Sequence, residues 1–221
     1  MDIKHNFVEK GTGEALILLH GNGEDNSIFT AQLDEFSKYY RTIALDTRGH
    51  GGTPRGNAPF TTRQFADDLA GFMEEHGIAK AHIFGFSDGG NIAMIFAAKY
   101  PEMVDKLILN GSNMNTNGVK AYFQLLVELG YRVSKQLNNT AKSEMLGLMV
   151  DGHEATVSEL ATIKAPTLVI AGTHDLIKSS HTKLIAQSIP DSQLVFIKGN
   201  HAVARLHPTE FNKIVLDFLR G

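Results

Sequence analysis

Short apolar segments alternate with longer amphipathic segments along the chain. The apolar segments are rich in Ile, Leu and Val and cover residues 15–19, 42–45, 81–86, 107–109, 167–171 and 194–197. Continuous apolar runs of this length are typical of strands that are covered on both faces, as in a mostly parallel sheet. We therefore predict a strand at each of the six segments.

The longer segments between these strands have the periodicity of helices. Residues 61–76 and 208–219 place their apolar side chains on one face, at intervals of three or four residues. Residues 89–99 are apolar almost all round, which is typical of a central, buried helix. Strands that alternate with helices predict an open α/β sheet with right-handed crossovers.

Residues 114–157 interrupt this alternation. They contain no clear strand, and residues 121–131 and 142–150 have a helical pattern. A chain of 221 residues lies within the size range of one α/β domain. We therefore predict a single domain over residues 1–221, with residues 114–157 as a small helical insertion over the sheet.

Composition and charge narrow the possible partners and compartment. A net charge of −3 disfavours a nucleic-acid-binding protein. The absence of cysteine excludes disulfides and thiolate metal sites, and no histidine spacing typical of a metal site is present, so we predict no metal. We also predict no membrane partner and a cytoplasmic location, because no signal sequence and no apolar run of ~20 residues is visible.

The strongest chemical signal is Gly85-Phe86-Ser87-Asp88-Gly89, which matches G-x-S-x-G, the nucleophile elbow. The motif lies between a predicted strand and a predicted helix, where a tight turn needs small residues two positions before and two positions after the serine. A glycine-rich turn with a capping serine is the alternative interpretation. The elbow predicts Ser87 as the nucleophile, with its oxygen at a helix N-terminus.

Partners for Ser87 follow other predicted strands. His20-Gly21-Asn22-Gly23 is a turn that directs a backbone N–H toward the site, so we predict an oxyanion hole from the N–H groups of Asn22 and Asp88. His20 itself is expected to hold this turn rather than to catalyse.

Asp175 and His201 each follow a predicted strand, in the chain order serine, acid, histidine. They are the predicted acid and base of a catalytic triad. His207 is the alternative base, and Asp151 and Asp191 are the alternative acids, but none of the three follows a strand directly.

With these motifs the chain resembles the α/β-hydrolase family over nearly its whole length, and Asp46-Thr47-Arg48-Gly49-His50-Gly51 resembles the family's D-x-R-G-x-G segment. The resemblance implies the α/β-hydrolase fold, a mostly parallel sheet of about eight strands flanked by helices, with a lid where residues 114–157 fall. The chain is shorter than most such members, which implies a trimmed lid. Ser-Asp-Gly-Gly at the elbow is also similar to the biphenyl-hydrolase-like and valacyclovir-hydrolase-like subgroup.

These features predict a serine hydrolase that cleaves carboxylic esters of small to medium size through an acyl-enzyme. A lactonase or a carbon–carbon bond hydrolase on the same fold is one alternative, and a non-catalytic ligand-binding or receptor protein is another. The expected partner is a small-molecule ester, and the chemistry needs no cofactor. The sequence leaves the oligomeric state open.

Three residues are candidates for substrate binding. Met145 and Met149 lie in the insertion and are expected to line an acyl pocket, because methionine adapts to irregular apolar ligands. The Asp88 side chain has two interpretations. It either complements the dipole of the following helix or faces the pocket and pairs with a cationic group of the substrate.

Overall fold

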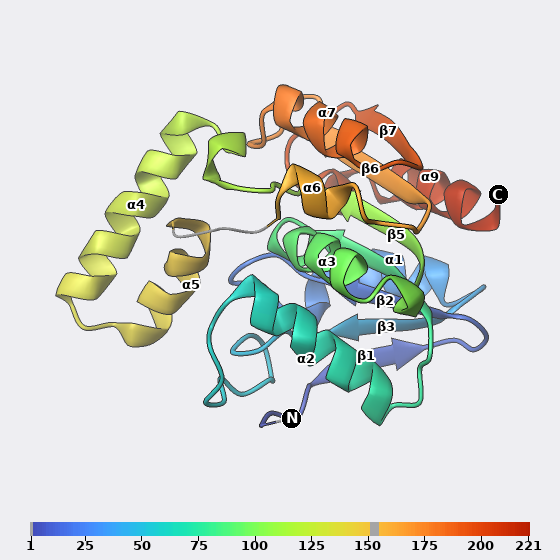
Figure 1. Cartoon of the computed structure of the whole chain (residues 1–221), viewed down its shortest axis with the longest axis horizontal. Helices are drawn as coiled ribbons and strands as arrows, with labels where there is room; N and C mark the ends of the chain where they lie inside the picture. Colours follow the sequence, from blue (N-terminus) through green and yellow to red (C-terminus); the bar gives the residue numbers. More distant parts are fainter. Residues whose placement is uncertain (1, 151–154) are drawn as a thin grey trace.

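The computed structural model describes residues 2–150 and 155–221, in which seven strands form one twisted sheet (Figure 1). The strands are β1 Phe7–Lys10, β2 Ala15–Leu19, β3 Arg41–Leu45, β4 Ala81–Phe86, β5 Val104–Asn110, β6 Thr167–Gly172 and β7 Ser192–Ile197. Their order is β1-β3-β2-β4-β5-β6-β7, with β1 antiparallel to β3 and every other pair parallel. The prediction of a mostly parallel α/β sheet is confirmed.

Helices connect the strands and cover both faces of the sheet. They are α1 Thr30–Phe36, α2 Thr62–Glu75, α3 Asp88–Lys99, α4 Ala121–Gln136, α5 Thr140–Val150, α6 Val157–Leu160, α7 Ser179–Ser188, α8 Val203–Leu206 and α9 Pro208–Arg220. Short 3₁₀ turns are η1 Asn26–Phe29, η2 Pro101–Met103 and η3 Thr116–Gly118. Sequence periodicity located the longer helices but not the shorter α1 and α7.

The expected number of strands was about eight, and the described residues contain seven. The segment before β1 is tied down by side chains rather than paired as a strand. His5 Nδ1 bonds to the Asp46 carbonyl, and Asn6 Nδ2 donates to the Asp46 carboxylate. Strand β1 was not predicted because it has no continuous apolar run. It is a four-residue edge strand that is mostly exposed and includes the charged residues Glu9 and Lys10.

Alternate side chains of the central strands pack into two separate hydrophobic cores, one on each face of the sheet. Leu16 and Leu18 of β2 pack in the layer that contains α1 and α9. Ile17 and Leu19 pack in the opposite layer, which contains α2 and α3. This period of two, with all four side chains buried, explains why the strand reads as a continuous apolar run.

The segment between β5 and β6 contributes two longer helices that stand at one side of the sheet. Helices α4 and α5 lie against each other and away from the packed layers (Figure 1). Within the described ranges, no helix is both long and apolar enough to cross a lipid bilayer.

Candidate active site

Ser87 lies at the sharp turn between β4 and α3, in a strained backbone conformation with φ 53° and ψ −121°. The turn leaves no room for side chains two residues before and two residues after the serine. A Cβ at Gly85 would collide with the Gly89 backbone, and a Cβ at Gly89 would collide with the Leu19 carbonyl. The two glycines of the motif are therefore required by close backbone approach.

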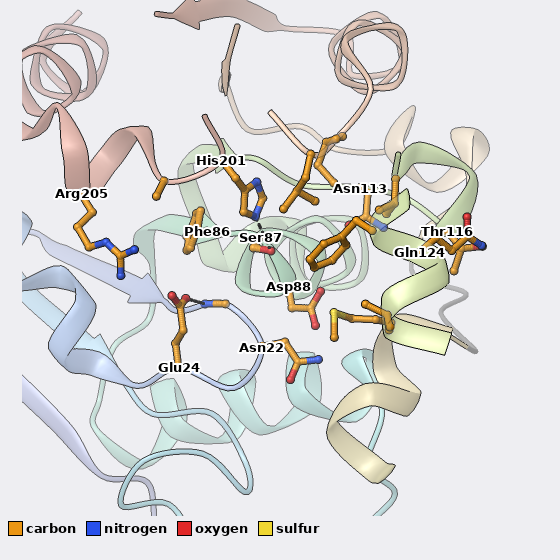
Figure 2. Close-up of a pocket in the computed structure, with 18 residues that line it drawn as sticks. Asn22, Glu24, Phe86, Ser87, Asp88, Asn113, Thr116, Gln124, His201 and Arg205 are labelled. Atoms are coloured by element: carbon orange, nitrogen blue, oxygen red, sulfur yellow. Dashed lines mark hydrogen bonds between the residues drawn. The ribbon is translucent and has the colours of Figure 1, made fainter. Parts of the chain in front are cut away.

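The structure brings together the three residues predicted as a triad. His201 Nε2 lies 3.0 Å from Ser87 Oγ, and His201 Nδ1 lies 2.7 Å from Asp175 Oδ1. Figure 2 shows the His201 imidazole beside Ser87, with a dashed line for the hydrogen bond between them. In this geometry Nε2 can accept the serine proton, while the carboxylate fixes the Nδ1–H tautomer.

Asp175 is held as a carboxylate by the hydrogen bonds around it. Its side chain is buried, and burial alone would raise its pKa. The hydrogen bond from His201 and the backbone N–H groups of Ile177 and Gly172 outweigh burial and lower the pKa below its ordinary value. A charged Asp175 is the form that can stabilise an imidazolium at His201.

The alternative base and acids lie elsewhere. His207 is exposed and precedes the first turn of α9, and His201 is the histidine within hydrogen-bonding distance of Ser87. Asp191 lies at the opposite end of the sheet, where its carbonyl accepts from the N–H of Thr167 at the start of β6. Asp151 lies outside the described residues.

The turn after β2 lies directly against Ser87. A Cβ added to Gly21 would be 3.2 Å from Ser87 Cβ, so the next backbone N–H, that of Asn22, borders the same space. The N–H groups of Asn22 and Asp88 donate to no acceptor within residues 2–150 and 155–221. Both donors therefore remain available to a ligand oxygen beside Ser87.

His20 holds this turn in place. Its Nδ1 bonds to the Gly21 carbonyl at 2.7 Å, and its Nε2 accepts from the N–H of Thr47 at 3.0 Å. Burial lowers the pKa of His20 to about 4, so the ring is neutral at pH 7. Thr47 is in turn anchored by its neighbour Arg48, which is buried and forms a salt bridge to Asp68 at 2.7 Å.

A cavity of about 280 Å³ opens beside the triad (Figure 2). Its walls come from the turn after β2, the elbow, α4, α5 and the loops after β5, β6 and β7; they are formed by Gly21, Asn22, Glu24, Phe86, Ser87, Asp88, Asn113, Thr116, Val119, Phe123, Gln124, Val127, Met149, Leu176, Ile177, His201, Ala202 and Arg205. Met149 is in this wall, as expected. Met145 is not, because its place on α5 lies over the β2 turn, where its carbonyl accepts a hydrogen bond from Asn22.

Asp88 faces this cavity from the first turn of α3. Its Oδ1 accepts from Asn91 Nδ2 at 3.1 Å, and its Oδ2 has no partner at hydrogen-bonding geometry among the described residues. Burial raises the pKa of Asp88 to about 6. The nearby Asn22 amide and His201 act in the opposite direction, but their effect is smaller. A carboxyl group that is buried beside a nucleophile and half satisfied is suited to bind a polar ligand group.

Three further site residues were not identified from the sequence. Gly111 has φ 63°, and a Cβ there would lie 2.7 Å from the His201 ring, so the glycine makes room for the imidazole. Glu24 accepts from the Gly21 N–H, and burial raises its pKa. Arg205 brings a positive charge to the same wall. Of these three residues, only Gly111 could have been noticed in the sequence, because it is a glycine that follows a strand directly. Gly21 has a similar place, two residues after β2.

The Asn22 side chain ties the turn after β2 to α5, because its Nδ2 donates to the Met145 carbonyl at 2.6 Å. We expect Asn22→Ala to keep the backbone donor and lose this tie. One hydrogen bond is worth about 1 kcal/mol, so kcat/KM should fall roughly 5–10-fold, mainly through KM. Steady-state kinetics on a short aryl ester will measure the split. A fall confined to kcat would instead indicate a direct effect on the oxyanion.

Comparison with known proteins gives the same type of fold. Residues 14–144 match the family model described as alpha/beta hydrolase fold. The chain is 30% identical over 268 residues to the 2-hydroxy-6-oxononadienedioate/2-hydroxy-6-oxononatrienedioate hydrolase of Burkholderia vietnamiensis, covering 99% of this chain and 92% of that protein. It is 29% identical over 258 residues to the 2-hydroxy-6-oxo-6-phenylhexa-2,4-dienoate hydrolase of Burkholderia cepacia, covering 96% and 89%.

Two solved structures share the fold over nearly all of the chain. The enol-lactonase of Burkholderia xenovorans superposes with a TM-score of 0.86 at 21% identity and covers 99% of this chain and 97% of its own. A thermophilic esterase of Thermogutta terrifontis superposes with a TM-score of 0.80 at 24% identity and covers 99% and 93%.

Proposed function

Because the chain belongs to the α/β-hydrolase family, we propose that it is a serine hydrolase that cleaves carboxylic esters of small to medium size. The observation that carries this proposal is the contact chain from Ser87 through His201 to Asp175, with hydrogen-bonding distances of 3.0 and 2.7 Å. An activated serine beside two free backbone donors is the arrangement that acyl transfer requires.

The reaction follows from this geometry. Ser87 Oγ attacks the ester carbonyl while His201 Nε2 takes its proton, and the N–H groups of Asn22 and Asp88 hold the oxyanion. His201 returns the proton to the leaving alcohol, which leaves an acyl group on Ser87. Water, activated by the same imidazole, then hydrolyses the acyl-enzyme. Asp175 orients the ring and stabilises its positive charge in both steps.

A second candidate is carbon–carbon bond hydrolysis, which the names of the Burkholderia relatives favour. Their names describe dienoate and dienedioate substrates, which are anions. Among the described residues, the cavity wall carries the two carboxyl groups of Asp88 and Glu24, and its only arginine or lysine is Arg205. A buried carboxylate beside the nucleophile disfavours an anionic substrate. This difference supports an ester or a lactone as the substrate.

The test is a substrate panel on the purified protein. It contains short-chain aryl esters, lactones, and vinylogous diketones with and without a carboxylate. The proposal expects the highest kcat/KM on the esters. A kcat/KM that is highest on the carboxylate-bearing diketones would replace it with the second candidate, and turnover of none of the classes would overturn both.

The short insertion is expected to set the acyl preference. Val119, Phe123, Val127 and Met149 give the cavity an apolar wall, and its volume of about 280 Å³ accommodates only a modest acyl group. Each buried CH₂ adds roughly 0.8 kcal/mol, or about fourfold in kcat/KM, until the wall is reached. We expect p-nitrophenyl esters to peak at short to medium chains, with no jump in rate above the micelle threshold. A strong preference for long-chain triglycerides would contradict this.

A further inference from the structure

The outward face of α4 carries a continuous row of exposed apolar side chains. They are Tyr122, Leu125, Leu126, Leu129 and Val133, each 44–67% exposed, together with Leu137, which follows the helix and is 74% exposed. Single exposed apolar residues are normal on a protein surface, but a contiguous row marks a surface that binds something. The opposite face of α4 is already packed, since Val127 and Ser134 are buried.

The spacing within this row is that of a helix-pairing seam. Tyr122, Leu126, Leu129 and Val133 are separated by four, three and four residues, the repeat of the a and d positions of a coiled coil. Side chains with this spacing lie along one line of the helix. No described segment of the chain covers that line.

We propose that this seam is the interface of a homodimer, in which two copies of α4 pack antiparallel about a two-fold axis. The seam is complementary to itself in that arrangement. With the axis midway between Leu126 and Leu129, each of these residues meets the other on the second copy, and Tyr122 meets Val133. All four layers are then apolar, and the same residues of both copies meet, as an isologous interface requires.

The size and charge of the row fit a second copy. The six exposed side chains offer on the order of 600 Å² per protomer, so a pair buries about 1,200 Å², the lower end for stable interfaces. Arg132 borders the row, and it lies opposite position 123 of the second copy in this register. The two Arg132 side chains are then nine positions apart, about 13 Å along the axis, so these two positive charges do not meet.

A lipid surface is the main competing occupant. An amphipathic helix that binds membranes usually has a polar face rich in lysine and arginine. Besides Arg132 and Lys135, α4 carries the acidic Glu128, which gives this helix little net positive charge. The balance of charge therefore favours self-association.

The proposed interface lies on the back of the cavity wall. Phe123 and Val127 line the cavity from the same helix that carries the seam. Dimer formation would hold this wall in position without any seam residue entering the cavity. The proposal is independent of which bond the enzyme cleaves.

Sedimentation equilibrium across the micromolar range tests the oligomeric state. The intact chain is expected at about twice its mass of 24.2 kDa. The double variant Leu126→Glu/Leu129→Glu should raise the dissociation constant by roughly 100-fold or more, because it buries charges in the seam. Leu184→Glu, at a position 40% exposed on α7, is the matched control and should leave the dimer intact.

A cross-linking experiment tests the register without relying on destabilising charges. The chain has no cysteine, so Leu126→Cys and Leu129→Cys introduce single thiols. Mixed chains should form disulfide heterodimers on mild oxidation, faster than either variant with itself. Self-cross-linking of each variant would overturn the antiparallel register. A monomeric intact chain, including one that co-sediments with anionic phosphatidylserine vesicles, would overturn the dimer.

Discussion

Ser87→Ala is expected to abolish hydrolysis of any substrate that the enzyme accepts, with a loss on the order of 10⁶ in kcat. Ser87 Oγ is the atom that His201 Nε2 contacts at 3.0 Å, and alanine leaves the imidazole without a nucleophile to activate. The fold should persist, because the methyl group fits where the serine Cβ already lies. Circular dichroism and kcat measured on the same preparation will separate the two effects.

A fluorophosphonate probe gives an independent readout of the same residue. It should label the intact chain at Ser87 only, as located by peptide mass spectrometry. Ser112→Ala is the matched control, since Ser112 is buried near α3 and its hydroxyl has no partner among the described residues. This control should keep both label and activity. Labelling at another serine, or substantial activity in Ser87→Ala, would remove Ser87 from its assigned role.

Much of the fold could be predicted because the sheet is buried on both faces. Residues 16–19 form a continuous apolar run because alternate side chains are buried in the cores on opposite faces of the sheet. The same holds for β4 and β6. The edge strand β1 lacks this signature because it is mostly exposed. The family resemblance implied about eight strands, and the described residues form seven.

Site residues could be predicted where backbone geometry restricts the sequence. Ser87 needs its glycines, and Asp175 and His201 directly follow strands that end at one edge of the sheet. Site residues that are brought together only by tertiary packing could not be identified from such sequence patterns. Glu24 and Arg205 line the same cavity only because the turn after β2 and helix α8 both border it. Met145 and Met149 are four residues apart on one helix, and only the position of that helix decides which one reaches the cavity.

Asp88→Asn is expected to remove a preference for cationic substrates. Asp88 lines the cavity beside Ser87, and its buried Oδ2 has no protein partner within the described residues. An aminoacyl ester can pair its amine with this oxygen in a desolvated site. Loss of one partner of such a pair costs about 4 kcal/mol, so kcat/KM for aminoacyl esters should fall on the order of 10³-fold. Neutral esters of equal size, measured in parallel, should change less than about tenfold, because asparagine keeps the shape and the backbone donor.

The pH dependence of this preference follows from the same carboxyl group. Burial raises the pKa of Asp88 to about 6, so the pairing anion is present above pH 6 and is lost as pH falls through 6. The substrate amine loses its proton above about pH 8, which closes the window from the other side. The ratio of kcat/KM for aminoacyl and neutral esters should therefore be highest between these values. A ratio that does not change with pH would contradict the pairing.

Thermal stability distinguishes this role from a simple interaction with the helix dipole. A carboxyl group with a raised pKa destabilises the folded state as pH rises from its ordinary value of 3.8 through about 6. Asp88→Asn removes that buried charge, so it should raise the melting temperature at pH 8 and change it little at pH 4. A carboxylate that mainly complements the dipole of α3 gives the opposite sign, with a lower melting temperature at pH 8. That lower value, together with equal kinetic effects on both ester classes, would leave Asp88 as a helix-stabilising residue with no part in choosing the substrate.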